Sequence, residues 1–152
     1  MNRFSRVVSL VAALSAATAM AAPVRAADGA EPRVVVYKSP DCGCCANWVE
    51  HLRSSGFVVD ARNVPDIDAV KLLAGVPEDL AACHTATVAG YVVEGHVPAR
   101  DIRRLLEEKP AANGIAVPGM PAGSPGMEQG GARDSYAVVL YSGKTRSVFA
   151  RY

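Results

Sequence analysis

The sequence lacks an excess of charge of either sign, because 16 lysine and arginine residues stand against 15 aspartate and glutamate residues and the formal net charge is +1. Such a chain offers no electrostatic footprint for nucleic acid. It also lacks an internal repeat, and it lacks an apolar run of the ~20 residues that a membrane-spanning helix needs. What it has is 152 residues, half of them hydrophobic, which predicts one domain with a core of its own.

The N-terminal segment differs from the rest of the chain. Arg3 and Arg6 give it a positive start, a long uncharged stretch of small and apolar residues follows, and Ala21 and Ala26 are small residues suited to signal peptidase. This order is typical of a secretory signal peptide. We therefore predict a signal peptide over residues 1–26, cleaved after Ala26, with Ala21 as the rival site and a short membrane anchor as the alternative.

Cleavage would leave a mature domain over residues 27–152 with 13 basic and 15 acidic residues, a net charge of −2. We expect this domain to be periplasmic and soluble, with no stable membrane insertion. It contains all four cysteines of the chain. In an exported protein, cysteines normally indicate disulfides, and four cysteines allow three pairings.

Alternating apolar patterns and turn residues predict an α/β domain. Residues 111–131, rich in proline, glycine and methionine, are expected to form a long loop, which in a compact domain is usually functional or disordered. The predicted order is a β-α-β-α-β-β-α core with a C-terminal β-hairpin, which resembles the thioredoxin-like architecture. The expected strands cover 33–37, 57–61, 85–89 and 91–94, the helices 46–55, 65–73 and 98–109, and the hairpin 136–141 and 147–151.

Three of the cysteines gather in the first β-α turn of this core. Cys42 and Cys45 have the C-x-x-C spacing, and the unpaired N–H groups and dipole of a helix N-terminus favour a thiolate there. That pair suits a redox dithiol or a metal site. Cys44 adds a third thiol that would compete with two-cysteine exchange, and soft thiolates select Cu(I), Zn(II) or iron–sulfur clusters. Because successive side chains diverge around a helix, thiolates that bridge several copper ions fit this turn better than one chelated ion.

Cys83 is the fourth cysteine of the candidate cluster. It lies just before the predicted strand over residues 85–89, in the loop that faces the dithiol turn of a thioredoxin-like fold and normally holds a cis-proline. The alternatives are a buried, inert Cys83 and a plain structural disulfide in the turn, which the third thiol makes less favourable. The paired knuckles of a zinc site and the usual spacing of an iron–sulfur site are absent from the sequence.

Four motifs cover residues 41–45, 83–85, 90–98 and 119–127. Together they resemble the CopG-type periplasmic copper-resistance proteins, over nearly all of the mature chain. The resemblance implies a thioredoxin-like fold, a role in copper resistance, and copper bound as a multinuclear, cysteine-bridged Cu(I) centre that interconverts Cu(I) and Cu(II). It implies copper ions and other periplasmic copper-handling proteins as partners. All four cysteines carry over as the metal ligands.

Two histidines and two methionines are candidate auxiliary ligands. His84 adjoins a cysteine, but adjacent strand residues point to opposite faces, so a surface position is equally open. His96 is favoured as a turn residue. Met120 and Met127 flank a Pro/Gly loop, where a thioether can bind Cu(I) or pack the loop down. His51 is expected to be an exposed helix residue.

Three functions therefore compete on the sequence alone. The first is a copper-binding resistance protein, with redox activity on the metal as an open question. The second is a thiol–disulfide oxidoreductase that uses Cys42 and Cys45, and the third is a zinc-binding structural module. The extra thiol of Cys44 and the thiol in place of the cis-proline favour the first.

Overall fold

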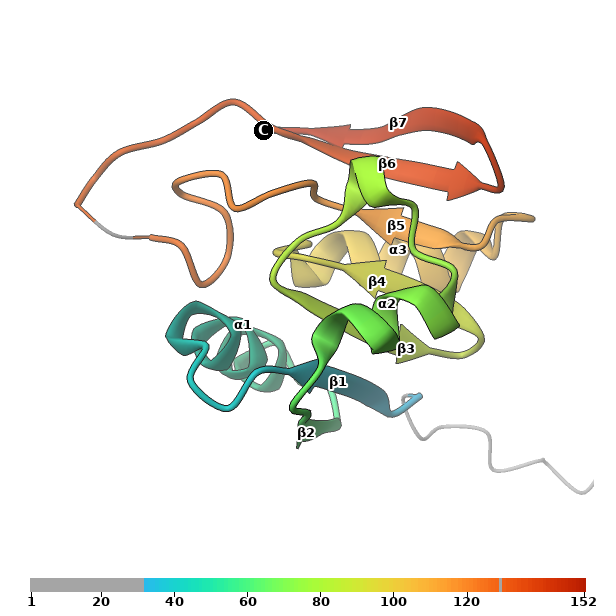
Figure 1. The fold of residues 1–152 in the computed structure, drawn as a ribbon. Coiled ribbons are helices and arrows are strands. Elements are labelled where there is room, and N and C mark those ends of the chain that lie inside the picture. Colours follow the sequence, from blue (N-terminus) through green and yellow to red (C-terminus); the bar gives the residue numbers. More distant parts are fainter. Residues whose placement is uncertain (1–31, 129) are drawn as a thin grey trace, which may run out of the picture.

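The computed structural model describes residues 32–128 and 130–152 (Figure 1). The predicted signal peptide over residues 1–26 lies outside the described residues. The elements follow the predicted order, with one further strand, β5. They are β1 (Val34–Lys38), α1 (Gly43–Ser54), β2 (Val59–Asn63), α2 (Ile67–Ala74), the 3-10 helix η1 (Glu78–Leu80), β3 (His84–Val88), β4 (Tyr91–Glu94), α3 (Ala99–Glu108), β5 (Gly114–Ala116), β6 (Ala137–Ser142) and β7 (Thr145–Arg151).

The seven strands of the described residues form one sheet in the order β2-β1-β3-β4-β5-β6-β7. β1 pairs with β2 in parallel and with β3 in the antiparallel direction, and β3 and β4 form an antiparallel hairpin. The expected α/β class is therefore confirmed, and the order of the first four strands is compatible with the thioredoxin-like architecture. β1 alternates buried and half-buried residues, as its Val-rich sequence predicts for a central strand.

The segment over residues 111–131 is not the uninterrupted loop expected from its prolines and glycines. Its residues Gly114–Ala116 form β5, which pairs in parallel with β4 and antiparallel with β6. Gly114 permits this pairing because a Cβ there would collide with the backbone carbonyl of Val92. β5 thereby joins the predicted C-terminal hairpin, β6 and β7, to the main sheet (Figure 1).

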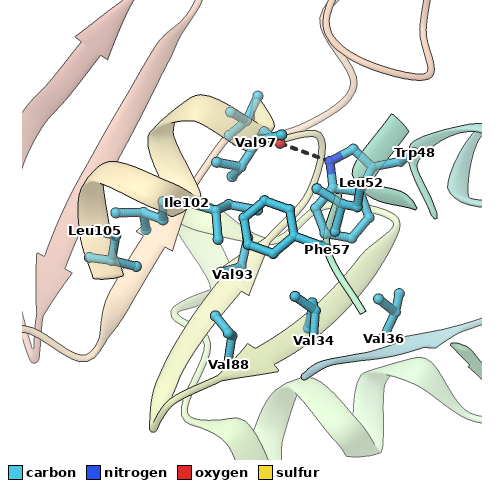
Figure 2. Packing of buried hydrophobic residues seen from close by; sticks show 14 of the residues in the cluster. Val34, Val36, Trp48, Leu52, Phe57, Val88, Val93, Val97, Ile102 and Leu105 are labelled. Atoms are coloured by element: carbon cyan, nitrogen blue, oxygen red, sulfur yellow. Dashed lines mark hydrogen bonds between the residues drawn. The ribbon is translucent and has the colours of Figure 1, made fainter. Parts of the chain in front are cut away.

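Helices cover both faces of the sheet, with α2 in front and α3 behind in Figure 1. The larger core lies on the face of α1 and α3, where Trp48, Leu52, Ile102 and Leu105 are fully buried against the valines of the central strands (Figure 2). Trp48 Nε1 donates a hydrogen bond of 2.9 Å to Val97 O, which fixes α1 against the start of α3.

Helix ends have clear local causes. Asp66 caps α2 by accepting a hydrogen bond of 3.0 Å from Ala69 N, and Gly75 ends it in the left-handed conformation with φ 67°. α3 begins after Pro98, as predicted. Among the helices of residues 32–128 and 130–152, none has the length and apolar character to cross a bilayer.

Candidate metal centre

The first β-α turn forms the start of α1 rather than a separate loop. The helix begins at Gly43, three residues before the predicted start, and Cys42 is its N-cap residue. The Cys45 N–H points at Cys42 Sγ, 3.3 Å away, so the motif itself caps the helix. Cys44 and Cys45 consequently lie in the first helical turn.

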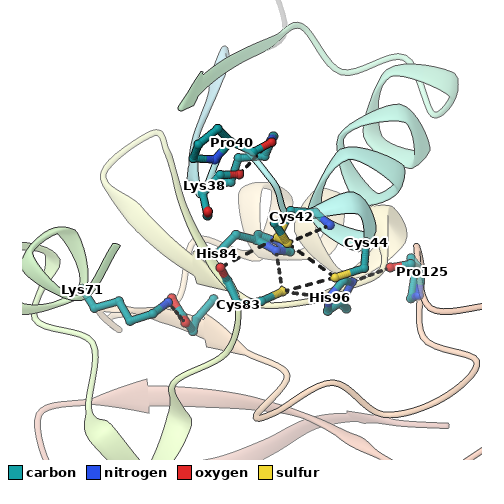
Figure 3. Close-up of a disulfide and its surroundings, with 12 residues drawn as sticks. Lys38, Pro40, Cys42, Cys44, Lys71, Cys83, His84, His96 and Pro125 are labelled. Carbon is teal, nitrogen blue, oxygen red and sulfur yellow. Dashed lines mark hydrogen bonds and ion pairs between the residues drawn. A yellow bond between two sulfur atoms is a disulfide. The ribbon is translucent and has the colours of Figure 1, made fainter. Parts of the chain in front are cut away.

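The structure brings the four predicted cysteines together. The four Sγ atoms all lie within 4.8 Å of one another, although Cys83 is far from the other three cysteines in the sequence. Cys44 Sγ lies 3.5 Å from Cys42 Sγ and 4.0 Å from Cys83 Sγ (Figure 3). Cys45 is buried and the other three are partly exposed, so the cluster lies at the protein surface.

Cys42 and Cys45 are joined by a disulfide, and Cys44 and Cys83 are free thiols. The sequence alone makes a disulfide in this turn a less favoured prediction than a metal site. The pairing has a simple geometric reason, because residues three apart at a helix start hold their Cα atoms 5.3 Å apart, within the range that a disulfide spans. The structure thus represents the oxidised form of the cysteine cluster.

Burial and the neighbouring Cys44 thiol raise the pKa of Cys83 from 9.0 to about 12. Burial is the larger of the two causes of this shift, because it disfavours the charged thiolate. Cys83 is therefore a protonated thiol at neutral pH, and a cation that binds it as a thiolate displaces a proton.

His96 lies in the bend after β4, as the sequence favoured, but its side chain faces the cysteine cluster. It is fully buried, its Nε2 lies 3.0 Å from Cys83 Sγ, and its Nδ1 lies 2.8 Å from Pro125 O. Gly95, with φ 72°, directs the chain so that the imidazole turns inward (Figure 3). Burial lowers the pKa of His96 below its ordinary value.

His84, for which the sequence left a surface position open, is also fully buried. Its Nδ1 lies 3.3 Å from Cys83 Sγ, its ring packs on Trp48 with centroids 4.3 Å apart, and its Nε2 has no hydrogen-bond partner among the described residues. Burial lowers its pKa well below the ordinary value, so the imidazole is neutral. Cys83, His84 and His96 thus form a second group of soft and borderline ligand atoms around one sulfur.

The part of the segment that follows β5, residues 117–128, is called the Pro/Gly/Met loop, and it packs on the cluster side of α1. A Cβ at Gly126 would lie 2.8 Å from both Cys44 O and Trp48 N, so only glycine allows this approach. Met120 is 54% exposed, and Met127 directly follows the glycine that packs on the helix.

One further prediction, on His51, needs correction. His51 is half-buried rather than exposed, because its Nε2 accepts a hydrogen bond of 3.1 Å from Ala99 N at the start of α3. Lys38, at the end of β1, is 8% exposed, and its Nζ donates to Ser39 O at 3.0 Å.

The sequence interpretation missed a buried polar network beside Cys83. Lys71 Nζ lies 2.5 Å from Glu94 Oε1 and 3.1 Å from Thr85 Oγ1, and Thr85 Oγ1 donates to Glu94 Oε2 at 2.7 Å. The available signal was the charged Glu94 at the end of an otherwise apolar strand. Its partner on α2 could not be assigned from the pattern.

Comparisons with known proteins agree with these features. The family model described as "Protein of unknown function, DUF411" matches residues 80–127, a range that includes Cys83, both buried histidines and the Pro/Gly/Met loop. Two solved structures, forms 1 and 2 of a copper resistance protein copG, are 45% and 44% identical to this chain. Each match covers 80% of this chain and 98% of the other, with a TM-score of 0.76. No curated protein sequence matches.

Proposed function

The chain belongs to the family of the copper resistance protein copG, and on this premise we propose that it acts in copper resistance by binding Cu(I) in a multinuclear, cysteine-bridged site. The observation that supports the proposal most is the approach of four sulfur atoms to within 4.8 Å of one another. The ligands are the thiolates of Cys42, Cys44, Cys45 and Cys83.

The ligand atoms of this site are of the kinds that bind Cu(I). Thiolate sulfur is a soft ligand that prefers Cu(I), and neutral imidazole also binds copper. The Nδ1 of His84, which lies 3.3 Å from Cys83 Sγ, and the Nε2 of His96 are therefore candidate auxiliary ligands. Met120 and Met127 are proposed as further auxiliary thioethers, because their loop packs on the N-terminal turn of α1.

The disulfide links the site to redox chemistry. Cys42 and Cys45 become available as thiolates only after two electrons reduce the disulfide. In the opposite direction, oxidation of the two thiolates to the disulfide releases two electrons, the number that converts two Cu(II) ions to two Cu(I) ions. We include this Cu(I)/Cu(II) interconversion in the proposal, with the two thiolates as the electron donors to Cu(II) and the disulfide as the electron acceptor from Cu(I).

The predicted signal peptide supports a periplasmic location, in which other copper-handling proteins would be the partners. N-terminal sequencing of the exported protein tests this part of the proposal, which expects Ala27 as the first residue. An intact Met1 in the membrane fraction would contradict it.

A thiol–disulfide oxidoreductase remains the second candidate function, and the disulfide between Cys42 and Cys45 favours it specifically. The disulfide lies at a helix N-terminus, where oxidoreductases place an attacking thiolate. Cys44 argues against it, since its sulfur lies 3.5 Å from that of Cys42 and offers a competing thiol.

An anaerobic titration of the reduced protein against a Cu(I) chelator distinguishes the candidates. The copper proposal expects more than one Cu(I) bound per chain. Saturation by a single Zn(II) ion with weak Cu(I) binding would instead support a zinc module. Rapid reduction of insulin by the protein, together with weak Cu(I) binding, would support the oxidoreductase.

A further inference from the structure

We propose that Glu94 is a positioning residue for Cys83: its buried carboxylate holds the backbone just before Cys83 and so keeps that sulfur within reach of Cys44. This inference rests on the proposed copper function only for its biological meaning. The geometry behind it belongs to residues outside the cysteine and histidine cluster.

The Glu94 carboxylate is fully buried and accepts from three donors. Oε1 accepts from Ala82 N at 2.7 Å and from Lys71 Nζ at 2.5 Å, and Oε2 accepts from Thr85 Oγ1 at 2.7 Å. Ala82 is the residue immediately before Cys83. The carboxylate therefore acts on the backbone of the ligand-bearing segment and not on the sulfur itself.

The residue that directly follows β4, Gly95, holds the other side of Cys83. Gly95 N donates to His84 O at 3.1 Å, and a Cβ at Gly95 would lie 2.6 Å from the Cβ of Ala82. Cys83 thus lies between two anchors, one on Ala82 and one on His84, which the last residue of β4 and the residue after it supply. Of these two anchors, only the one from Glu94 comes from a side chain.

The ion pair with Lys71 explains why a carboxylate can stay in this position. An unpaired buried carboxylate would be strongly unfavourable, and a buried ammonium with further hydrogen bonds compensates it. The side chain of Lys71 is 10% exposed and that of Glu94 is not exposed at all. The pair also connects α2 to β4, so the position of Cys83 depends on a contact between two separate elements (Figure 3).

A small movement of this segment would matter to the cluster. Cys83 Sγ is 4.0 Å from Cys44 Sγ and 3.0 Å from His96 Nε2. Copper–sulfur and copper–nitrogen bonds are short, so a bridging ligand that moves by about 1 Å no longer binds one of its two copper ions. Reaction rates are similarly sensitive to a misplacement of this size.

Two double variants separate positioning from simple stability. Lys71→Met/Glu94→Gln removes both charges but keeps a side-chain oxygen that can accept from Ala82 N and an amide that can donate to Thr85. Lys71→Met/Glu94→Met also removes both charges, has a similar volume and offers no acceptor. Neither leaves an unpaired buried charge, so the two differ chiefly in the anchor on Ala82.

The readout needs no copper. In a Cys42→Ser/Cys45→Ser background, Cys44 and Cys83 are the only thiols, and diamide oxidises them to a disulfide at a rate that depends on their approach. We expect the glutamine pair to cross-link close to the background rate and the methionine pair to be slower by about tenfold. With the native cysteines restored, the methionine pair alone should bind fewer Cu(I) ions per folded chain and change the absorption spectrum of the copper-loaded protein.

Thr85→Val is the matched control. It removes one donor to Glu94, so it should lower the melting temperature, yet it leaves the anchor on Ala82 and should not slow cross-linking. Equal cross-linking rates for the two double variants would overturn the positioning role and leave a purely structural ion pair. Failure of every variant and of the wild type to bind Cu(I) would overturn the copper function, and the cross-linking result would still decide the role of Glu94.

A measurement on the unchanged protein covers the case in which the methionine pair fails to fold. If Glu94 holds Ala82, the Ala82 amide hydrogen exchanges far more slowly than in an unstructured chain. An unprotected Ala82 amide in the folded wild type would overturn the proposal.

Discussion

The Nε2 atom of His96 lies 3.0 Å from the Sγ atom of Cys83, while the Nδ1 atom of the same ring lies 2.8 Å from Pro125 O. A carbonyl oxygen only accepts hydrogen bonds, which assigns the ring proton to Nδ1 and leaves the lone pair of Nε2 facing the thiol. The Pro/Gly/Met loop therefore sets the tautomer of an imidazole at the cysteine cluster. A metal-binding histidine needs its second nitrogen oriented in this way.

The disulfide predicts a redox-dependent copper capacity. Oxidised protein retains only Cys44 and Cys83 as free thiols, so it should bind fewer Cu(I) ions per chain than protein reduced under anaerobic conditions. Copper analysis after gel filtration, with thiol counting on the same samples, measures the difference. Equal copper loading in the two states would show that Cys42 and Cys45 are not ligands.

Copper binding should release protons and strengthen as the pH rises. Burial raises the pKa of Cys83 to about 12, so the thiol is protonated at neutral pH and must lose its proton to bind as a thiolate. The buried imidazoles of His84 and His96, whose pKa values are lowered below the ordinary value, are neutral at pH 7 and release no proton there. Each proton released should raise the apparent Cu(I) affinity by up to about tenfold per pH unit between pH 6 and 8.

Chelator competition across that range, corrected for the protonation of the chelator, provides the measurement. Calorimetry in two buffers of different ionisation enthalpy gives the proton count independently. An affinity that does not change with pH would contradict thiolate binding by Cys83.

The metal-free protein should lose stability in acid. Burial lowers the folded-state pKa values of His84 and His96 below 6.5, so below this pH the unfolded chain takes up protons that the folded chain does not. The free energy of unfolding should therefore fall as the pH drops below about 6.5, by up to about 1.4 kcal/mol per pH unit for each histidine.

Urea unfolding at several pH values tests this, with His84→Leu as the comparison. The variant removes one buried imidazole whose Nε2 has no partner among the described residues, so its stability should depend less steeply on pH. An unchanged pH dependence would show that His84 does not contribute.

The Pro/Gly/Met loop should not tolerate a side chain where it meets α1. Gly126 has φ 84°, and a Cβ there would lie 2.8 Å from Cys44 O and Trp48 N, so Gly126→Ala should cost about 1–3 kcal/mol and shift Pro125 away from His96. Thermal unfolding and the NMR signals of the His96 ring measure the two effects.

Gly119→Ala is the control, because Gly119 has a similar φ of 69° but nothing within 4 Å of the added Cβ. Gly119→Ala therefore introduces the strain of a positive φ without a steric clash of the added Cβ. Equal destabilisation by both substitutions, with the His96 signals unchanged, would mean that the loop does not support the site.

The sequence was sufficient for the features that local patterns determine. The Val-rich run of β1, the Pro98 start of α3 and the turn-separated β6 and β7 each carry their signal within a few residues. The clustering of three thiols in the first turn could also be predicted, because a C-x-C-C spacing brings thiols together in any fold. Their position at the N-cap and in the first turn of α1 could not, since the capping contact depends on one sulfur and one amide.

The buried polar residues of the site depend on contacts between distant segments. His96 faces inward because its partners are Cys83, 13 residues away, and Pro125, 29 residues away. Glu94 is buried because Lys71, 23 residues away on α2, compensates its charge. A glycine–histidine pair before a helix, or a glutamate that ends a strand, looks like a solvated turn when those partners are unknown.

Cys83→Ser tests the central claim most directly, because it separates a copper cluster from a disulfide oxidoreductase. Serine is nearly isosteric, so the protein should fold, and the loss of one bridging thiolate should sharply lower the number of Cu(I) ions bound per folded chain, as Cys42→Ser and Cys45→Ser should also do. In an oxidoreductase a remote cysteine is dispensable. Full copper loading of Cys83→Ser, with a strong disulfide-exchange activity that only Cys42→Ser or Cys45→Ser abolishes, would contradict the account.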